Sequence, residues 1–134
     1  KRKKAIHYII QTLLKQVSKY KECNAILPIP SSWDFVNIVT KALSSTLQLP
    51  VTQAFEKSTK GKIKTMSRAQ RFLMISESYK FKENIKIPQT ILLFDDVWTT
   101  GASMNYCAKL LKDNVNVKVH ALTLFRKPYQ LETL

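Results

Sequence analysis

The residues best suited to chemistry lie in one segment, where an apolar run leads into two carboxylates and then into a turn rich in hydroxyl groups. Residues 91–94 are apolar, Asp95 and Asp96 follow them, and residues 99–103 read Thr-Thr-Gly-Ala-Ser. A helix is expected at residues 103–113. Such a turn gathers backbone N–H groups, hydroxyls and the positive end of a helix dipole, which together suit a phosphate group. The carboxylates suit vicinal hydroxyls or a hydrated cation, so a ribose 5-phosphate would satisfy both parts of the segment.

The glycine content excludes two common nucleotide-binding motifs. Gly61 and Gly101 are the only glycines in the chain, so neither the G-x-x-x-x-G-K-[ST] loop nor the G-x-G-x-x-G turn is present. A calcium-binding loop is excluded as well, because it needs acidic or amide side chains at alternating positions. Val97, Thr99 and Gly101 occupy those positions here.

The same segment closely resembles the loop that binds phosphoribosyl diphosphate (PRPP) in the type I phosphoribosyltransferases. The resemblance implies that Asp95 and Asp96 hydrogen-bond the ribose hydroxyls. It also implies that the following turn wraps the 5-phosphate through Thr99, Thr100, Gly101, Ala102 and Ser103. The resemblance further implies that Mg²⁺ is bound mainly through PRPP. It identifies neither a protein ligand for Mg²⁺ nor a catalytic residue. Alternatively, the carboxylates only cap a strand, although adjacent carboxylates repel each other without a cation or ligand.

Within this superfamily, the order of parts is similar to the ComF/ComFC branch, which contains competence-linked proteins of natural transformation. Residues 25–30, Ala-Ile-Leu-Pro-Ile-Pro, match the first strand end of that branch, and a basic segment ending at residues 78–81 precedes the PRPP loop. The chain departs from the branch where Met74 replaces the asparagine of an R-x-x-N pattern that begins at Arg71. The resemblance covers about residues 25–126 and implies a zinc module with four cysteines upstream of this chain.

The alternation of expected strands and helices predicts a parallel sheet with helices on both faces. With the resemblance, it predicts the α/β fold of type I phosphoribosyltransferases in one domain, residues 1–134. This domain would contain an N-terminal helical segment at 1–20, a mobile basic hood at 56–82, and the PRPP loop and last strand at 90–126. Strands are expected at residues 25–27, 51–55, 90–96 and 117–125, and helices at 4–20, 34–47, 67–76 and 103–113.

A second candidate loop follows the first expected strand. Ligands of parallel sheets bind at the carboxyl ends of the strands, and in the superfamily the loop at this place contacts pyrophosphate. Pro30, Ser31 and Ser32 are therefore candidate pyrophosphate-binding residues. Alternatively, the prolines only end the strand, and this loop has no role in binding.

Positive charge is the remaining signal. The 22 lysines and arginines outnumber the 9 acidic residues, which gives a net charge of +13. One group of basic residues lies at 1–4, and another lies in the expected hood at Lys57, Lys60, Lys62, Lys64, Arg68 and Arg71. Such a field attracts polyanions, so the hood residues are candidate contacts to DNA or, alternatively, to pyrophosphate. Tyr79 and Phe81 could stack on bases, but we favour core positions for both.

Two functions are compatible with these features. The resemblance favours a PRPP-binding, ComFC-like competence protein that handles incoming single-stranded DNA in the cytoplasm, with DNA-uptake proteins as partners at the inner face of the membrane. The alternative is a Mg²⁺-dependent phosphoribosyltransferase that displaces pyrophosphate from PRPP onto an unknown acceptor. The absence of a membrane-spanning apolar run and of a signal peptide agrees with a cytoplasmic domain. Cys23 and Cys107 are expected to be reduced, partly buried thiols, and His7 and His120 to be helix and strand residues, not metal ligands.

Overall fold

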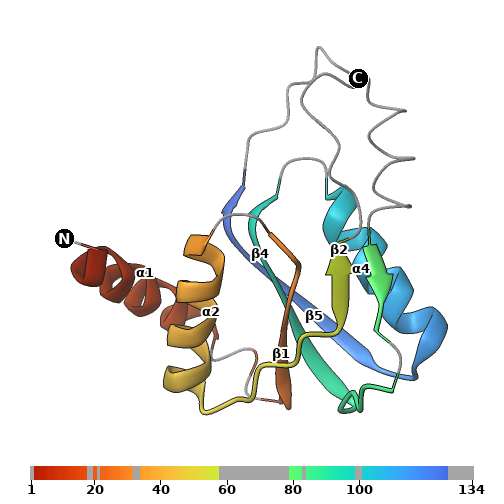
Figure 1. The fold of residues 1–134 in the computed structure, drawn as a ribbon. Coiled ribbons are helices and arrows are strands. Elements are labelled where there is room, and N and C mark those ends of the chain that lie inside the picture. Colours follow the sequence, from red (N-terminus) through yellow and green to blue (C-terminus); the bar gives the residue numbers. More distant parts are fainter. Residues whose placement is uncertain are drawn as a thin grey trace, which may run out of the picture.

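The computed structural model of the chain (Figure 1) describes residues 2–17, 20, 22–31, 34–57, 79–82, 84–98 and 101–126. Its elements, in chain order, are α1 (Arg2–Val17), β1 (Ala25–Pro28), α2 (Asp34–Leu47), β2 (Phe55–Lys57), β3 (Tyr79–Phe81), β4 (Thr90–Trp98), α4 (Ala102–Asn114) and β5 (Lys118–Arg126). Three of the four expected helices are present within a few residues of their predicted bounds. The fourth, at residues 67–76, lies outside the described residues, as does most of the basic hood.

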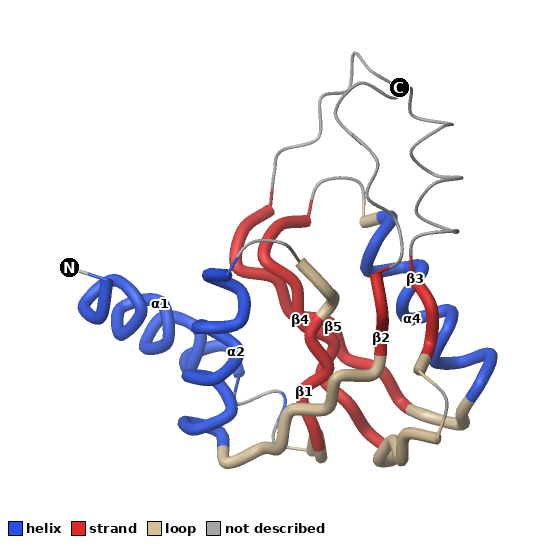
Figure 2. Tube along the Cα trace, in the orientation of Figure 1, coloured by secondary structure: helices blue, strands red, loops and turns tan. Residues whose placement is uncertain are grey.

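The central sheet consists of three parallel strands in the order β1–β4–β5. In its register, Ala25 pairs with Ile91, and Ile91 pairs with Val119 on the other side. Figure 2 shows α1 and α2 on one side of this sheet and α4 on the other. A middle strand covered on both faces must be apolar on both faces, which explains the unbroken apolar run at the start of β4. The expected α/β architecture is therefore confirmed.

Alternate residues of β4 enter two separate cores. Leu92 and Phe94 pack with apolar side chains of α1 and α2. Ile91 and Leu93 pack with the buried face of α4 and with the β2–β3 pair. Because successive side chains of a strand point to opposite faces, Asp95 continues the second series and lies on the α4 side of the sheet.

The helix α2 has the bounds that the sequence predicts. Val36, Val39 and Leu43 recur at three- and four-residue spacing and are buried against the sheet. The Thr40 hydroxyl is also buried there and donates a hydrogen bond to the carbonyl oxygen of Val36 at 2.6 Å. No helix of the described residues is long and apolar enough to cross a membrane.

The sequence predicted a strand at residues 51–55, and the position of this prediction is wrong. Val51 makes only an isolated parallel bridge to Ile26, and β2 begins at Phe55, where an antiparallel pair with β3 begins. Residues 56 and 57, expected in a loop, belong to this pair. Burial explains the shift: Phe55 is buried and packs edge-on against the ring of Phe81, with ring centroids 6.3 Å apart. This contact extends the pairing into two polar, exposed residues.

An ion-pair cluster joins the connection before β1 to the edge strand β5. Glu22 Oε1 lies 3.0 Å from Lys118 Nζ and 2.7 Å from His120 Nε2. The ring of Tyr20 packs edge-on against His120, with centroids 5.5 Å apart. His120 is a strand residue, as the sequence predicted, and the structure adds Glu22 as its partner. Both cysteines are buried free thiols.

Candidate functional site

The acidic pair lies within β4, not after its end. β4 continues through Asp95 and Asp96 to Trp98, because its pairing with β5 continues past Asp95, which lies opposite Thr123. β1 ends earlier, where Pro28 pairs with Phe94. The Ile29 N–H then donates to the Phe94 carbonyl oxygen at 2.8 Å. The exit of β1 is thereby held one residue before the acidic pair, so Pro30 and Ser31 follow β1 at the same carboxyl-terminal edge of the sheet as Asp95 and Asp96.

Asp95 is the most electrostatically perturbed carboxyl group of the described residues. Its Oδ1 accepts a hydrogen bond from the Asp96 backbone N–H at 2.8 Å. Burial, and after it the hydrogen bond to the Asp96 side chain, raise the pKa of Asp95 from its ordinary value of 3.8 to about 7. The Asp96 N–H and the positive charge of Lys57 oppose this rise in pKa. A carboxyl group in this state would gain from hydroxyl donors or a cation, because both stabilise its charged form.

The turn after β4 ends in a glycine that its backbone requires. Gly101 has φ 79° and ψ 4°, in the left-handed region, where a Cβ atom costs about 1–2 kcal/mol. Its carbonyl oxygen accepts the Asn105 N–H at 2.8 Å and so begins the hydrogen bonding of α4. α4 is anchored on the sheet by Met104 and Cys107, which are both buried. The first turn of α4 is therefore held close to the end of β4, with its positive dipole end near the acidic pair.

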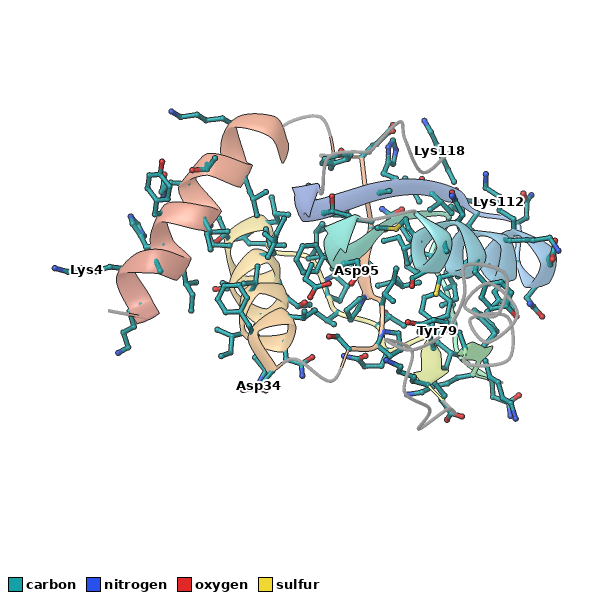
Figure 3. All side chains as sticks on the ribbon, turned by 90° about the horizontal axis from the view of Figure 1, so that it is seen from above. Lys4, Asp34, Tyr79, Asp95, Lys112 and Lys118 are labelled. Atoms are coloured by element: carbon teal, nitrogen blue, oxygen red, sulfur yellow. The ribbon has the colours of Figure 1, made fainter. Side chains whose placement is uncertain are left out.

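Figure 3 looks down on the carboxyl-terminal edge of the sheet, with Asp95 between α2 and α4 and Tyr79 beside α4. Of the seven residues predicted to bind PRPP, the structure places five around this edge: Asp95, Asp96, Gly101, Ala102 and Ser103. Thr99 and Thr100 lie outside the described residues. Pro30 and Ser31 of the predicted pyrophosphate loop are half-buried and follow β1, whereas Ser32 is not described.

Two residues outside the predicted PRPP loop lie near this site. Lys57 was a candidate contact to DNA or, alternatively, to pyrophosphate, and its positive charge lowers the pKa of Asp95. Tyr79 is a core residue, as expected, and it packs in one core with Met104 and Cys107 of α4. The alternating pattern Tyr79-Lys-Phe81 is typical of a short strand and could have indicated such a placement. The other candidate DNA contacts, Lys60, Lys62, Lys64, Arg68 and Arg71, lie outside the described residues.

The described residues contain no group of three or more His, Cys, Asp or Glu side chains that could hold a metal ion alone. Asp95 and Asp96 nevertheless supply oxygen ligands of the kind that Mg²⁺ prefers. Mg²⁺ usually keeps several waters and takes further oxygens from substrate phosphates. The residues present therefore fit a cation that is held largely by a phosphorylated ligand.

Comparison with solved structures finds phosphoribosyltransferases. An adenine phosphoribosyltransferase superposes with a TM-score of 0.62 and 16% identity, covering 90% of this chain and 68% of that one. The xanthine-guanine-hypoxanthine phosphoribosyltransferase of Helicobacter pylori gives a TM-score of 0.60 and 18% identity, covering 88% and 73%. A purine phosphoribosyltransferase from Pyrococcus horikoshii Ot3 gives 0.59 and 17%, covering 94% and 76%. No protein-family model and no curated protein matches the sequence.

These likenesses define the class of fold. The parallel sheet β1–β4–β5 with helices on both faces is the phosphoribosyltransferase fold. At sequence identities of 16–18%, this structural similarity shows the fold but not the reaction. The similarity to the ComF/ComFC branch remains a prediction from the sequence.

Proposed function

We propose that this chain binds PRPP together with Mg²⁺ at the carboxyl-terminal edge of β1 and β4. One observation supports the proposal: the middle strand of a phosphoribosyltransferase fold carries Asp95 and Asp96 near its carboxyl end, and the left-handed Gly101 begins α4. Carboxylates for a diol thus lie next to N–H groups for a phosphate. PRPP carries both chemical groups on one ribose.

Each part of the site would have a distinct role. The carboxylates of Asp95 and Asp96 would accept hydrogen bonds from the two ribose hydroxyls, which would compensate the cost of holding two negative charges side by side. Gly101, Ala102 and Ser103 would surround the 5-phosphate at the positive end of the α4 dipole. When bound, Mg²⁺ would supply positive charge to the pyrophosphate oxygens. The segment of Pro30, Ser31 and Ser32 would face the pyrophosphate from the exit of β1.

The reaction that best fits this arrangement is displacement of pyrophosphate from the ribose by an acceptor nucleophile. The bond between the anomeric carbon and the pyrophosphate oxygen breaks, and a new bond to the acceptor forms. Catalysis of this kind depends on positioning and on stabilising the leaving charge, so no side chain is assigned as an acid or base. The acceptor class is left open by the described residues.

The experiment that tests this proposal is product analysis. The chain is incubated with PRPP, Mg²⁺ and a panel of purines, pyrimidines and amines, and released pyrophosphate is followed by ³¹P NMR. Acceptor-dependent pyrophosphate release that is lost in Asp96→Ala supports the transferase. Tight PRPP binding without release for any acceptor would instead leave a PRPP-binding protein without transferase activity.

We propose a second role, binding of single-stranded DNA, which the net charge of +13 supports. The lysines and arginines at residues 57–71 form a basic segment with no acidic residue between them. Such a segment would contact the phosphate backbone without reading sequence. In this role the chain would be a ComFC-like competence protein that handles incoming DNA in the cytoplasm, together with DNA-uptake partners and an upstream zinc module.

A further inference from the structure

The helix α1 has two faces of opposite character. Its apolar face packs in the core that it shares with α2, where Ile10 and Leu13 are buried and Ile6 and Ile9 are partly buried. Residues three or four positions apart share one face of a helix, so these four residues attach α1 to the domain along one side. Figure 1 shows α1 at the outside of the domain, beyond α2, and its other face is directed outward.

The outward face of α1 combines lysines with one aromatic ring. Its outer stripe consists of Lys4, Tyr8, Gln11 and Lys15, which follow each other at spacings of four, three and four residues and are all exposed. Among the residues that the structure describes, Tyr8 is the large apolar side chain that is exposed, at 72%. The helix contains no acidic residue that could neutralise the stripe. The stripe extends over about 16 Å along the helix axis.

An exposed aromatic ring between lysines matches the chemistry of single-stranded DNA. Lysine ammonium groups neutralise phosphates and release their counterions. An aromatic ring can stack on any base that has no partner strand, because every base has a flat face. Tyr8 has a lysine four residues before it and another seven residues after it, so a strand along α1 could place a base on the ring and phosphates on both sides.

We propose that the outer stripe of α1 binds single-stranded DNA, with Tyr8 stacking on a base and with Lys4 and Lys15 contacting phosphates. This inference rests on the DNA-binding role proposed above and deepens it, because it adds a surface on α1 to the basic segment at residues 57–71. It also adds base stacking to what was a contact by charge alone.

A lipid surface fits the same helix less well. A helix that lies in a membrane interface places a wide apolar face among the lipids. In α1 that face is already packed in the core shared with α2. Figure 3 shows Lys4 directed away from the sheet, on the far side of α2 from Asp95. The outer stripe is therefore separate from the proposed PRPP site, and the two can be tested independently.

The test measures binding of fluorescent oligo(dT) to the chain by anisotropy across a series of salt concentrations. Tyr8→Leu keeps an apolar side chain at an exposed position and removes the ring. It should weaken binding by about fivefold or more, as expected for the loss of one stacked base, whereas Tyr8→Phe should bind as the unmodified protein does. A double change of Lys4 and Lys15 to glutamine should reduce the steepness of the log–log salt dependence by about 1.4. The same change of Lys86 and Lys112, which are exposed outside α1, should have a smaller effect.

A second measurement locates the contact directly. Oligo(dT) in which one thymine is replaced by 5-iodouracil should cross-link to Tyr8 on illumination, and mass spectrometry should find the modified residue in the α1 peptide. Equal affinities of Tyr8→Leu and the unmodified protein for oligo(dT), without a cross-link at Tyr8, would overturn the inference. If affinity is then lost on changing Lys60, Lys62 and Lys64, the DNA-binding role stands without α1.

Two further outcomes would also count against the inference. Absence of oligo(dT) binding at low salt would refute both the DNA-binding role and the surface on α1. If Tyr8→Leu weakens binding to polyglutamate or to vesicles containing phosphatidylglycerol, but leaves oligo(dT) binding unchanged, the stripe serves an acidic protein or a membrane and not DNA.

Discussion

Asp95 and Asp96 are linked by a hydrogen bond in which the backbone N–H of Asp96 donates to Asp95 Oδ1 at 2.8 Å. This bond favours the charged form of Asp95, but burial and the neighbouring carboxyl group outweigh it and raise its pKa to about 7. A structural strand would be more stable without this pair. The arrangement is understandable if a ligand supplies further donors or positive charge at this edge of the sheet.

The raised pKa of Asp95 predicts a pH-dependent stability. Between pH 3.8 and about 7 the folded protein keeps a proton on Asp95 that the unfolded chain has lost. Stability from this group is therefore present at low pH and decreases as the pH rises through that range. We expect Asp95→Asn to stabilise the ligand-free protein at pH 8 by about 1–2 kcal/mol, measured by urea denaturation.

The matched control for this prediction is Asp113→Asn. Asp113 is exposed and forms an ion pair with Lys109 at 3.5 Å on α4. An exposed pair contributes only about 0–1 kcal/mol, so this variant should not stabilise the protein at pH 8. If the Asp95→Asn variant is less stable than the unmodified protein at pH 8, the ionised Asp95 carboxylate does not destabilise the folded state.

Gly101→Ala should damage both the turn and the ligand site. Alanine at φ 79° should cost about 1–2 kcal/mol in stability, seen as a lower Tm, and should reduce the affinity for ribose 5-phosphate severalfold in calorimetry. Asn84→Ala provides the control, because Asn84 also has a positive φ, 62°, but lies before β4. Equal losses of ligand affinity in both variants would refute a specific role for the turn.

The sequence predicts the parts of this fold that are set by local pattern. α2 and the β4–α4 unit were predicted because apolar spacing and Gly101 each act within a few residues. The β2–β3 pair was missed because each strand has three residues and is stabilised by a partner more than twenty residues away. For the same reason, the sequence does not show that Tyr79 packs with Met104 and Cys107 of α4.

DNA binding by the basic segment has a quantitative signature. The logarithm of the binding constant for single-stranded DNA should fall linearly with the logarithm of the salt concentration. Each phosphate contact should contribute about 0.7 to the steepness of this line. Changing Lys60, Lys62 and Lys64 together to alanine should flatten the slope by about 2 if each contacts a phosphate. A triple variant of the exposed Lys41, Lys86 and Lys112 removes the same charge elsewhere. Equal changes of slope in both variants would point to a general charge effect and not to a DNA site.

The most direct test of the central claim is calorimetric titration of PRPP into the chain, with and without Mg²⁺, for the unmodified protein and for Asp96→Ala. We predict binding that is tighter with Mg²⁺ and that weakens in Asp96→Ala by about fivefold to a hundredfold, corresponding to about 1–3 kcal/mol for a lost hydrogen bond to the ligand. Asp113→Ala should bind as the unmodified protein does. Absence of PRPP binding, or equal affinity in Asp96→Ala and the unmodified protein, would contradict the proposed site.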